Sequence, residues 1–191
     1  MVFVLSKVED VIELAPDTSN TDTAIALTSA INAKYANRVI MDVGLAICLF
    51  DLLSQSDGIV KPGNGSAYMT VVFRVIVFRP FLGEVLTGKI ASQDASGLKI
   101  TLGFFDDIQI SSHHLPEGST FDLSENIWIW ETDGNKLYLD NDEQIRFKVE
   151  HEQFIDCTPT QRNPLQASNV PYALQASAAT PGLGLMSWWE D

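Results

Sequence analysis

Residues 43–78 read VGLAICLFDLLSQSDGIVKPGNGSAYMTVVFRVIVF, and this stretch decides the fold of the first half of the chain. Two long runs of β-forming residues, Val43 to Leu53 and Tyr68 to Phe78, flank a glycine-rich segment from Ser54 to Ser66. Strand-forming runs that are separated by turn residues predict a β-hairpin. We therefore expect two long antiparallel strands joined by an extended tip.

The residues before this hairpin predict one strand and one helix. Residues 1–14 alternate weakly between apolar and polar side chains, which is typical of a strand. Between residues 21 and 37, apolar side chains recur at spacings of three and four and give a helix one apolar face. These side chains are Ala24, Leu27, Ile31 and Tyr35. Residues 1–80 thus predict a small α+β domain, with one helix on an antiparallel sheet.

The residues after the hairpin, 81–156, alternate between short strand-like segments and turn signals. About five strands of this length predict a small closed barrel, and an OB-fold is the architecture that we expect. An open β-sandwich is the alternative. The expected strands cover residues 84–90, 97–102, 108–111, 127–130, 137–139 and 145–150.

Residues 157–191 predict an extended tail. The first part is polar and contains prolines, so it cannot build a core, whereas the end carries Leu185, Trp188 and Trp189. Exposed indoles at a terminus favour association, and tryptophan is a common anchor of interfaces. We interpret the tail as a tether with a docking peptide that binds either its own domain or a partner.

Charge is unevenly distributed along the chain. The net charge is −13, from 25 acidic and 12 basic residues, and residues 81–156 alone carry a net charge of −10. The first half is nearly balanced, so the contrast predicts a domain boundary near residue 80. An acidic surface repels phosphate, which argues against tight binding of duplex DNA through a broad basic face.

The two cysteines, Cys48 and Cys157, are far apart and lack the spacing of a metal site, which suits a reducing compartment. The longest apolar run, residues 43–53, is too short to span a bilayer. We expect a soluble, intracellular protein that does not associate with membranes.

No catalytic constellation is evident. The adjacent His113 and His114 would diverge on an extended chain, and His151 stands alone, so we expect no metal site. The carboxylate pair Asp106 and Asp107 could bind magnesium or serve in acid–base chemistry, but a polar turn is the simpler interpretation. We predict neither catalysis nor a cofactor, and a hydrolase that uses this pair with a histidine is the alternative.

A nucleic-acid face is the other candidate site. Lys89, Lys99, Phe104 and Phe105 fall within the first three expected strands, which usually carry the ligand face of an OB-fold. They predict weak, salt-dependent binding of single-stranded RNA, and ordinary solvated lysines with core phenylalanines are an equally open interpretation. A free-standing protein that binds single-stranded RNA is the corresponding alternative function.

Short motifs in a fixed order run through almost the whole chain. They are MVFVL (1–5), VGLAIC (43–48), PGNGS (62–66), FR (73–74), VFRPF (77–81), GFFDDI (103–108), WIW (128–130), LYLD (137–140), IRFKV (145–149), PYAL (171–174) and GLGLMSWW (182–189). In this order, the chain resembles the larger stalk subunits of eukaryotic and archaeal RNA polymerases. The terminal Ser187-Trp188-Trp189 resembles the end of the subunits in the RNA polymerase III branch of that family.

The resemblance implies an amino-terminal tip domain, an OB-fold domain and a non-catalytic role in the nucleus. It implies pairing with the smaller stalk subunit, docking on the polymerase III core near the RNA exit path, recruitment of initiation factors and contact with emerging single-stranded RNA. The loop that inserts into the core corresponds to Lys61, Pro62, Gly63, Asn64, Gly65 and Ser66. Asn64 stands where an aspartate is usual in the family.

Overall fold

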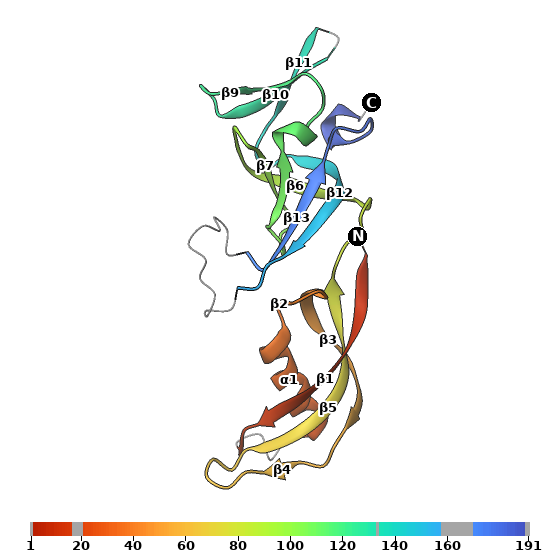
Figure 1. Ribbon diagram of the computed structural model, residues 1–191, viewed down its shortest axis with the longest axis vertical. Helices are drawn as coiled ribbons and strands as arrows, with labels where there is room; N and C mark the ends of the chain where they lie inside the picture. Colours follow the sequence, from red (N-terminus) through yellow and green to blue (C-terminus); the bar gives the residue numbers. More distant parts are fainter. Residues whose placement is uncertain (1, 17–20, 133, 158–169, 190–191) are drawn as a thin grey trace. The chain divides into compact units, whose positions relative to one another are not determined.

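A computed structural model describes residues 2–16, 21–132, 134–157 and 170–189 (Figure 1). The chain divides into two compact units, Val2–Arg79 and Pro80–Asp191. The first unit combines one α-helix with strands, and the second unit is built mainly from strands.

The amino-terminal unit is an antiparallel sheet with one helix on it. The strand order is β1-β5-β3-β2, and the short β4 also pairs with β5. The expected hairpin is formed by β3 and β5, and the α+β prediction is confirmed. The elements are β1 (Phe3–Leu14), α1 (Thr23–Tyr35), β2 (Arg38–Ile40), β3 (Gly44–Gln55), β4 (Ile59–Val60) and β5 (Ala67–Phe78).

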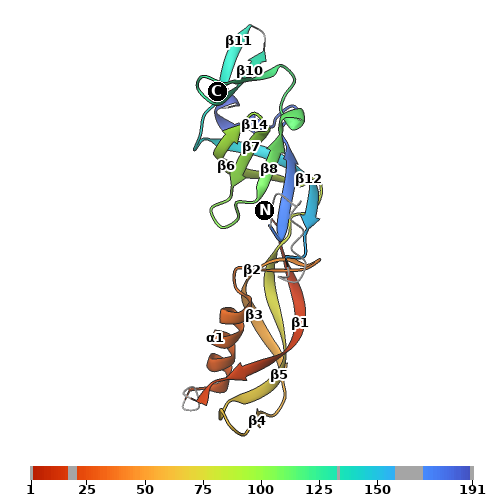
Figure 2. The same cartoon turned by 60° about the vertical axis from the view of Figure 1, so that its left-hand side comes forward.

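Helix α1 lies on one face of this sheet, as Figure 2 shows. The carboxylate of Asp22 caps the helix by accepting a hydrogen bond from the Ala24 N–H at 2.8 Å. Leu27 and Ile31 are fully buried, as predicted, whereas Ala24 in the first turn is exposed. Leu27 and Ile31 pack on every second residue of β5, the set whose side chains face the helix. These residues are Met69, Val71, Phe73, Val75 and Val77.

The carboxyl-terminal unit contains a closed five-stranded barrel, which agrees with the predicted OB-fold and excludes the open sandwich. The strands follow the order β13-β8-β7-β6-β12, and pairing of β12 with β13 closes the barrel. Strands β8 and β13 are parallel, and the other barrel pairs are antiparallel. The barrel strands are β6 (Val85–Asp94), β7 (Gly97–Thr101), β8 (Ile108–Ser111), β12 (Gln144–Phe154) and β13 (Tyr172–Ser177).

Two of the strands expected in the barrel lie outside it. Strands β10 (Ile127–Thr132) and β11 (Asn135–Leu139) pair with each other and with β9 (Ser119–Asp122), and they form a separate three-stranded sheet. This sheet is an insertion between β8 and β12 in the chain. We call it the insertion sheet.

The prediction of an extended tail from residue 157 is wrong for the described part after residue 169. Residues 172–177 form β13, the strand that closes the barrel, because Tyr172, Leu174 and Ala176 alternate into the core. A further short strand, β14 (Gly184–Leu185), pairs with β12 and is followed by a 3-10 turn, η4 (Met186–Trp188). Residues 158–169 of the predicted tether lie outside the described residues.

Candidate functional site

The carboxylate pair 106–107 serves the local fold. Asp106 accepts a hydrogen bond from the Thr101 hydroxyl, and that hydroxyl oxygen accepts one from the Gly103 N–H. The backbone carbonyl of Asp107 accepts from the Leu174 N–H of β13. The pair therefore stabilises a turn and a strand contact, as the simpler interpretation predicts.

The described residues offer neither a metal site nor a membrane span. No three His, Cys, Asp or Glu side chains within the described ranges converge as metal ligands. In the same ranges, no helix is long and apolar enough to cross a bilayer. The surfaces that remain as candidates are the tip, an open sheet face, the outside of the barrel and the carboxyl-terminal tryptophans.

The tip loop is held by a small polar network. The N–H of Lys61 donates to the Ser66 carbonyl at 3.2 Å and closes the turn. The side-chain amide of Asn64 donates to Glu13 of β1 at 3.4 Å and to the Tyr68 hydroxyl at 3.3 Å, and its oxygen accepts from the Ser66 N–H at 3.1 Å. Hydrogen bonds from Ser66 and Tyr68 lower the pKa of the Glu13 carboxyl.

The tip presents apolar side chains to solvent. Residues 61–65 are all exposed, while Ser66 is buried. Beside them, Ile59 and Val60 of β4 are 71% and 63% exposed. Gly63 has a φ of +117° and no heavy atom within 4 Å of the position of a Cβ, so its backbone conformation rather than crowding requires glycine. This combination of a fixed turn and exposed apolar residues is suited to docking.

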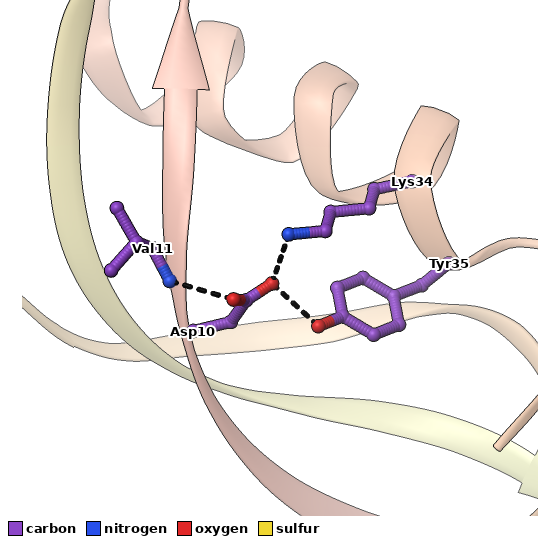
Figure 3. Close-up of polar contacts among 4 residues, drawn as sticks. All are labelled: Asp10, Val11, Lys34 and Tyr35. Carbon is purple, nitrogen blue, oxygen red and sulfur yellow. Dashed lines mark hydrogen bonds and ion pairs between the residues drawn. The ribbon is translucent and has the colours of Figure 1, made fainter.

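Helix α1 is fastened to β1 by the carboxylate of Asp10 (Figure 3). The Lys34 ammonium donates to it at 2.5 Å, the Tyr35 hydroxyl at 2.6 Å and the Val11 N–H at 2.8 Å. Partial burial would raise the pKa of Asp10, but these hydrogen bonds and the Lys34 charge outweigh it and leave that pKa lowered. Partial burial and the Asp10 carboxylate raise the pKa of Tyr35 to about 12.

The opposite face of the sheet is open and apolar, and sequence reasoning missed it. Strand β1 alternates, so one set of its residues faces away from the helix-covered core, next to the outward residues of β5 such as Val72 and Ile76. Phe3, Leu5 and Val11 of this set are 44–50% exposed. The sequence does contain an indication of this apolar face. Residues 3–5 are apolar at every position, so a strand that contains them is apolar on both faces.

One ion pair sits in the middle of this open face. Arg74 of β5 donates two hydrogen bonds to the Asp51 carboxylate of β3, one of them at 2.8 Å, and its guanidinium lies over the Phe50 ring at 5.2 Å. The hydrogen bond from Arg74 lowers the pKa of Asp51. Phe50 adds another exposed ring. Lys7 and Glu9 of β1 lie on the same face, with Lys7 in register with Arg74.

The predicted nucleic-acid residues are only partly together. Lys89 and Lys99 both lie on outward positions of β6 and β7, because their neighbours along each strand are buried. They line two different hollows on the barrel. Phe104 is partly exposed, but Phe105 is only 6% exposed and packs against Tyr172 with ring centroids 5.5 Å apart. Phe105 is therefore a core residue, and its predicted contact with RNA bases is corrected.

The barrel face also contains polar residues that the sequence did not single out. Lys99 of β7 pairs in register with Gln109 of β8, which pairs with Gln175 of β13. These three side chains line one hollow together with Gln93 and Gln153. Gln175 could not be assigned to this face because β13 was expected to be part of a tail.

The carboxyl-terminal residues dock on their own unit. Leu185 is fully buried in β14 opposite Ile145 of β12. The Trp188 ring packs on Trp130 of β10, with centroids 4.8 Å apart, and the Trp189 indole N–H donates to the Leu183 carbonyl at 3.2 Å. These contacts agree with docking of the tail on its own domain, and docking of the exposed part of Trp189 on a partner stays a prediction.

Comparison with known proteins places these features in a family. A family model described as RNA polymerase III subunit Rpc25 matches residues 84–189. A second model, described as the SHS2 domain found in the N terminus of Rpb7p/Rpc25p/MJ0397, matches residues 9–65.

Similar full-length proteins carry corresponding names. The chain is 42% identical to DNA-directed RNA polymerase III subunit rpc8 of Schizosaccharomyces pombe, with 99% of this chain and 100% of that protein covered. It is 41% identical to subunit RPC8 of Saccharomyces cerevisiae, with the same coverage, and 38% identical to RPC8 of Bos taurus, with 98% of each chain covered.

Proposed function

Because the chain belongs to the RNA polymerase III subunit Rpc25 family, we propose that it is the larger, non-catalytic stalk subunit of a nuclear RNA polymerase III. The main support for this proposal is the similarity of the chain to polymerase III subunits, which covers nearly the full length of this chain and of each relative. In this role it pairs with the smaller stalk subunit, docks on the polymerase core and takes part in recruiting initiation factors.

The open face of the amino-terminal sheet is the proposed site for the smaller stalk subunit. Phe3, Leu5, Val11 and Phe50 leave 44–53% of their surface exposed on a sheet whose other face is covered by α1. Apolar side chains gathered on a strand face gain free energy when a partner covers them. Arg74 is paired with Asp51 on this face, while Lys7 and Glu9 of β1 remain for polar contacts with the partner.

The tip is the proposed contact with the polymerase core. Ile59 and Val60 are the apolar anchors, and the loop 61–66 fixes their position through the Asn64 network. Because β4 pairs only with the end of β5 through two residue pairs, the tip contributes little to the core of its own unit. A surface of this kind can be altered without unfolding the domain.

Emerging RNA is the third proposed contact, through Lys89, Lys99 and Phe104 on the outside of the barrel. Lysines on adjacent strands attract phosphates, and the partly exposed Phe104 offers a ring face to a base. The surrounding charge is acidic, so binding should be weak and should fall with salt. Lys89→Glu should weaken it further.

A reconstitution separates the two protein contacts. The chain is co-expressed with the smaller stalk subunit, and the heterodimer is added to polymerase III core that lacks its stalk. Val60→Asp should leave the heterodimer intact and weaken core binding by at least about tenfold, because a charge replaces an anchor. Leu5→Asp should instead prevent heterodimer formation.

Leu82→Asp is the matched control, since Leu82 is an exposed leucine of the second unit and has no proposed contact. If Val60→Asp binds the core like the control, the docking assignment of the tip is wrong. If Leu5→Asp still forms the heterodimer, the open face belongs to another partner.

The free-standing RNA-binding protein is the second candidate, and the outward Lys89 and Lys99 favour it. It predicts a monomer in cell extracts, with no polymerase subunit attached. Size-exclusion chromatography of an extract, probed for this chain, distinguishes the two candidates.

A further inference from the structure

The carboxyl-terminal tryptophans do more than close the barrel, because they leave an aromatic surface in a fixed position. The carboxyl-terminal segment lies beside the insertion sheet (Figures 1 and 2). Trp188 of η4 packs there on Trp130 of β10, and Trp189 is the next residue in the chain. Trp189 is 49% exposed, and the other two are half-buried. We call these three residues the tryptophan platform.

The rings of the platform are held in place by hydrogen bonds and packing, unlike those of a frayed terminus. The Trp130 indole N–H donates to the Glu117 carbonyl at 2.9 Å, and the Trp189 indole N–H donates to the Leu183 carbonyl. Trp188 packs over Gly184, where a Cβ would come within 2.5 Å of its ring. Because the rings are already ordered, little conformational entropy is lost when a partner covers them.

The chain segment that carries Trp130 is strongly acidic. Residues 117–143, which include the insertion sheet, contain eight acidic residues and one basic residue, a net charge of −7 out of −13 for the whole chain. The basic residue, Lys136, is paired with Glu131 at 3.0 Å. Glu117 lies next to Trp130 through its backbone carbonyl, and Glu143 lines a hollow together with Met186 and Ser187 next to Trp188. Arg146 of β12 lies beside the same segment and donates to the Gly182 carbonyl at 3.5 Å.

Aromatic faces and carboxylates attract the same kind of ligand. The face of an indole carries negative charge density and binds Lys and Arg side chains, and a field of carboxylates concentrates cations. Phosphates are repelled by the same field, so a nucleic acid that stacked its bases here would lose free energy through its backbone. The aromatic and the electrostatic features independently favour a cationic protein segment.

We propose that the tryptophan platform and its acidic rim bind an arginine- or lysine-bearing segment of a partner protein. The cationic side chains lie over the indoles, Trp189 foremost, and Glu117 and Glu143 hold the neighbouring charges. The carboxylates are distributed over the insertion sheet and the loops that flank it, so the occupant is an extended segment with several cationic residues rather than one side chain.

A binding experiment with defined probes tests the proposal on the full-length chain. The probe is a fluorescein-labelled peptide of alternating arginine and glycine, about twelve residues long, and the readout is fluorescence anisotropy at increasing salt. The same peptide with glutamate in place of arginine and a single-stranded oligouridylate are the comparison probes. We expect saturable, salt-sensitive binding of the arginine peptide alone at the platform.

Variants at Trp189 test whether the arginine side chains of the peptide bind the face of the indole ring. Trp189→Leu keeps an apolar side chain but removes the aromatic face, so it should weaken arginine-peptide binding at least about fivefold. Trp189→Phe keeps an aromatic face and should stay within about twofold of the unaltered chain. The double variant Glu117→Gln with Glu143→Gln should also weaken binding and flatten its salt dependence. Phe81→Ala, at an exposed aromatic of the same unit, is the matched control and should bind normally.

Several results would overturn the proposal. These are absence of saturable binding of the arginine peptide, equal binding by Trp189→Leu and the unaltered chain, or oligouridylate binding that Trp189→Leu abolishes. The last result would assign the platform to nucleic acid. Circular dichroism of each variant verifies that the fold is retained, so a loss of binding reports on the platform itself.

Discussion

Asp10 shows how one carboxylate fastens two elements. It accepts from the side chains of Lys34 and Tyr35 at the end of α1 and from the backbone of its own strand (Figure 3). These bonds outweigh the effect of partial burial and lower the pKa of Asp10, whereas partial burial and the Asp10 carboxylate together raise the pKa of Tyr35. The unit should therefore lose stability at both extremes of pH.

The alkaline side gives the sharper prediction. The pKa of Tyr35 is about 12 in the folded chain and about 10 in the unfolded chain, so the stabilisation is complete below pH 10 and is lost as pH rises through 12. Tyr35→Phe should be less stable by about 1 kcal/mol near neutral pH and should lose less stability than the unaltered chain above pH 10. Urea unfolding at several pH values measures both. Parallel stability curves would contradict the role of the hydroxyl.

Asn64 gives a second prediction at this scale. Its amide donates to the Glu13 carboxylate, so an aspartate at this position would place two carboxylates about 3.4 Å apart. Asn64→Asp should raise the pKa of Glu13 from its lowered value and loosen the tip. Carbon-detected NMR titration of Glu13 measures the change, and Asn64→Ala, which removes the bond without adding charge, should shift the pKa less. An unchanged Glu13 pKa in Asn64→Asp would contradict the network.

Among the elements, β14 and η4 depend on the absence of a side chain at Gly184. The φ there is +102°, and a Cβ would lie 2.5 Å from the Trp188 ring. Gly182 also has a positive φ, +85°, but nothing lies within 4 Å of its Cβ position. Comparing substitutions at the two glycines therefore separates the cost of backbone strain from the cost of crowding the Trp188 ring.

Gly184→Ala should destabilise the carboxyl-terminal unit by about 2–4 kcal/mol and release Trp188, whereas Gly182→Ala should cost only about 1 kcal/mol of backbone strain. Thermal unfolding measures the stabilities, and near-ultraviolet circular dichroism reports the Trp188–Trp130 contact. Equal effects of the two substitutions would show that packing of Trp188 adds no stability.

The elements also show where sequence reasoning succeeds. Strand β5 and helix α1 follow from local patterns, because each has a period that shows which face is buried, and β3 follows from its long run of β-forming residues. Membership of the barrel does not follow from such patterns. Strands β10 and β11 have the same composition as barrel strands, and only their pairing with β9 separates them. Strand β13 is short and contains Gln175, so its burial depends on β8 and β12 on either side of it.

The candidate sites were predictable to a similar extent. The tip loop follows from its glycines and from the family resemblance, and the tryptophans from their place near the end of the chain. The burial of Phe105 depends on Tyr172, which is distant in the sequence, so alternation alone could not distinguish it from Phe104. The open face of the first sheet depends on which side α1 covers, and that is a tertiary property.

At the scale of the whole molecule, the two units have different tasks in the proposed function. The first carries the tip and the open sheet face, and its charge is nearly balanced. The second is strongly acidic and carries the outward lysines and the tryptophan platform. Protein contacts should accordingly depend on apolar burial in the first unit and on salt in the second.

The central claim is that the chain is a stalk subunit of RNA polymerase III, and affinity purification tests it most directly. The chain is tagged at its endogenous locus and purified at moderate salt, and the recovered proteins are quantified by mass spectrometry. We predict near-stoichiometric recovery of the smaller stalk subunit and of the polymerase III core, without the cores of polymerases I and II. Recovery of the chain alone, as a monomer free of polymerase subunits, would contradict the claim.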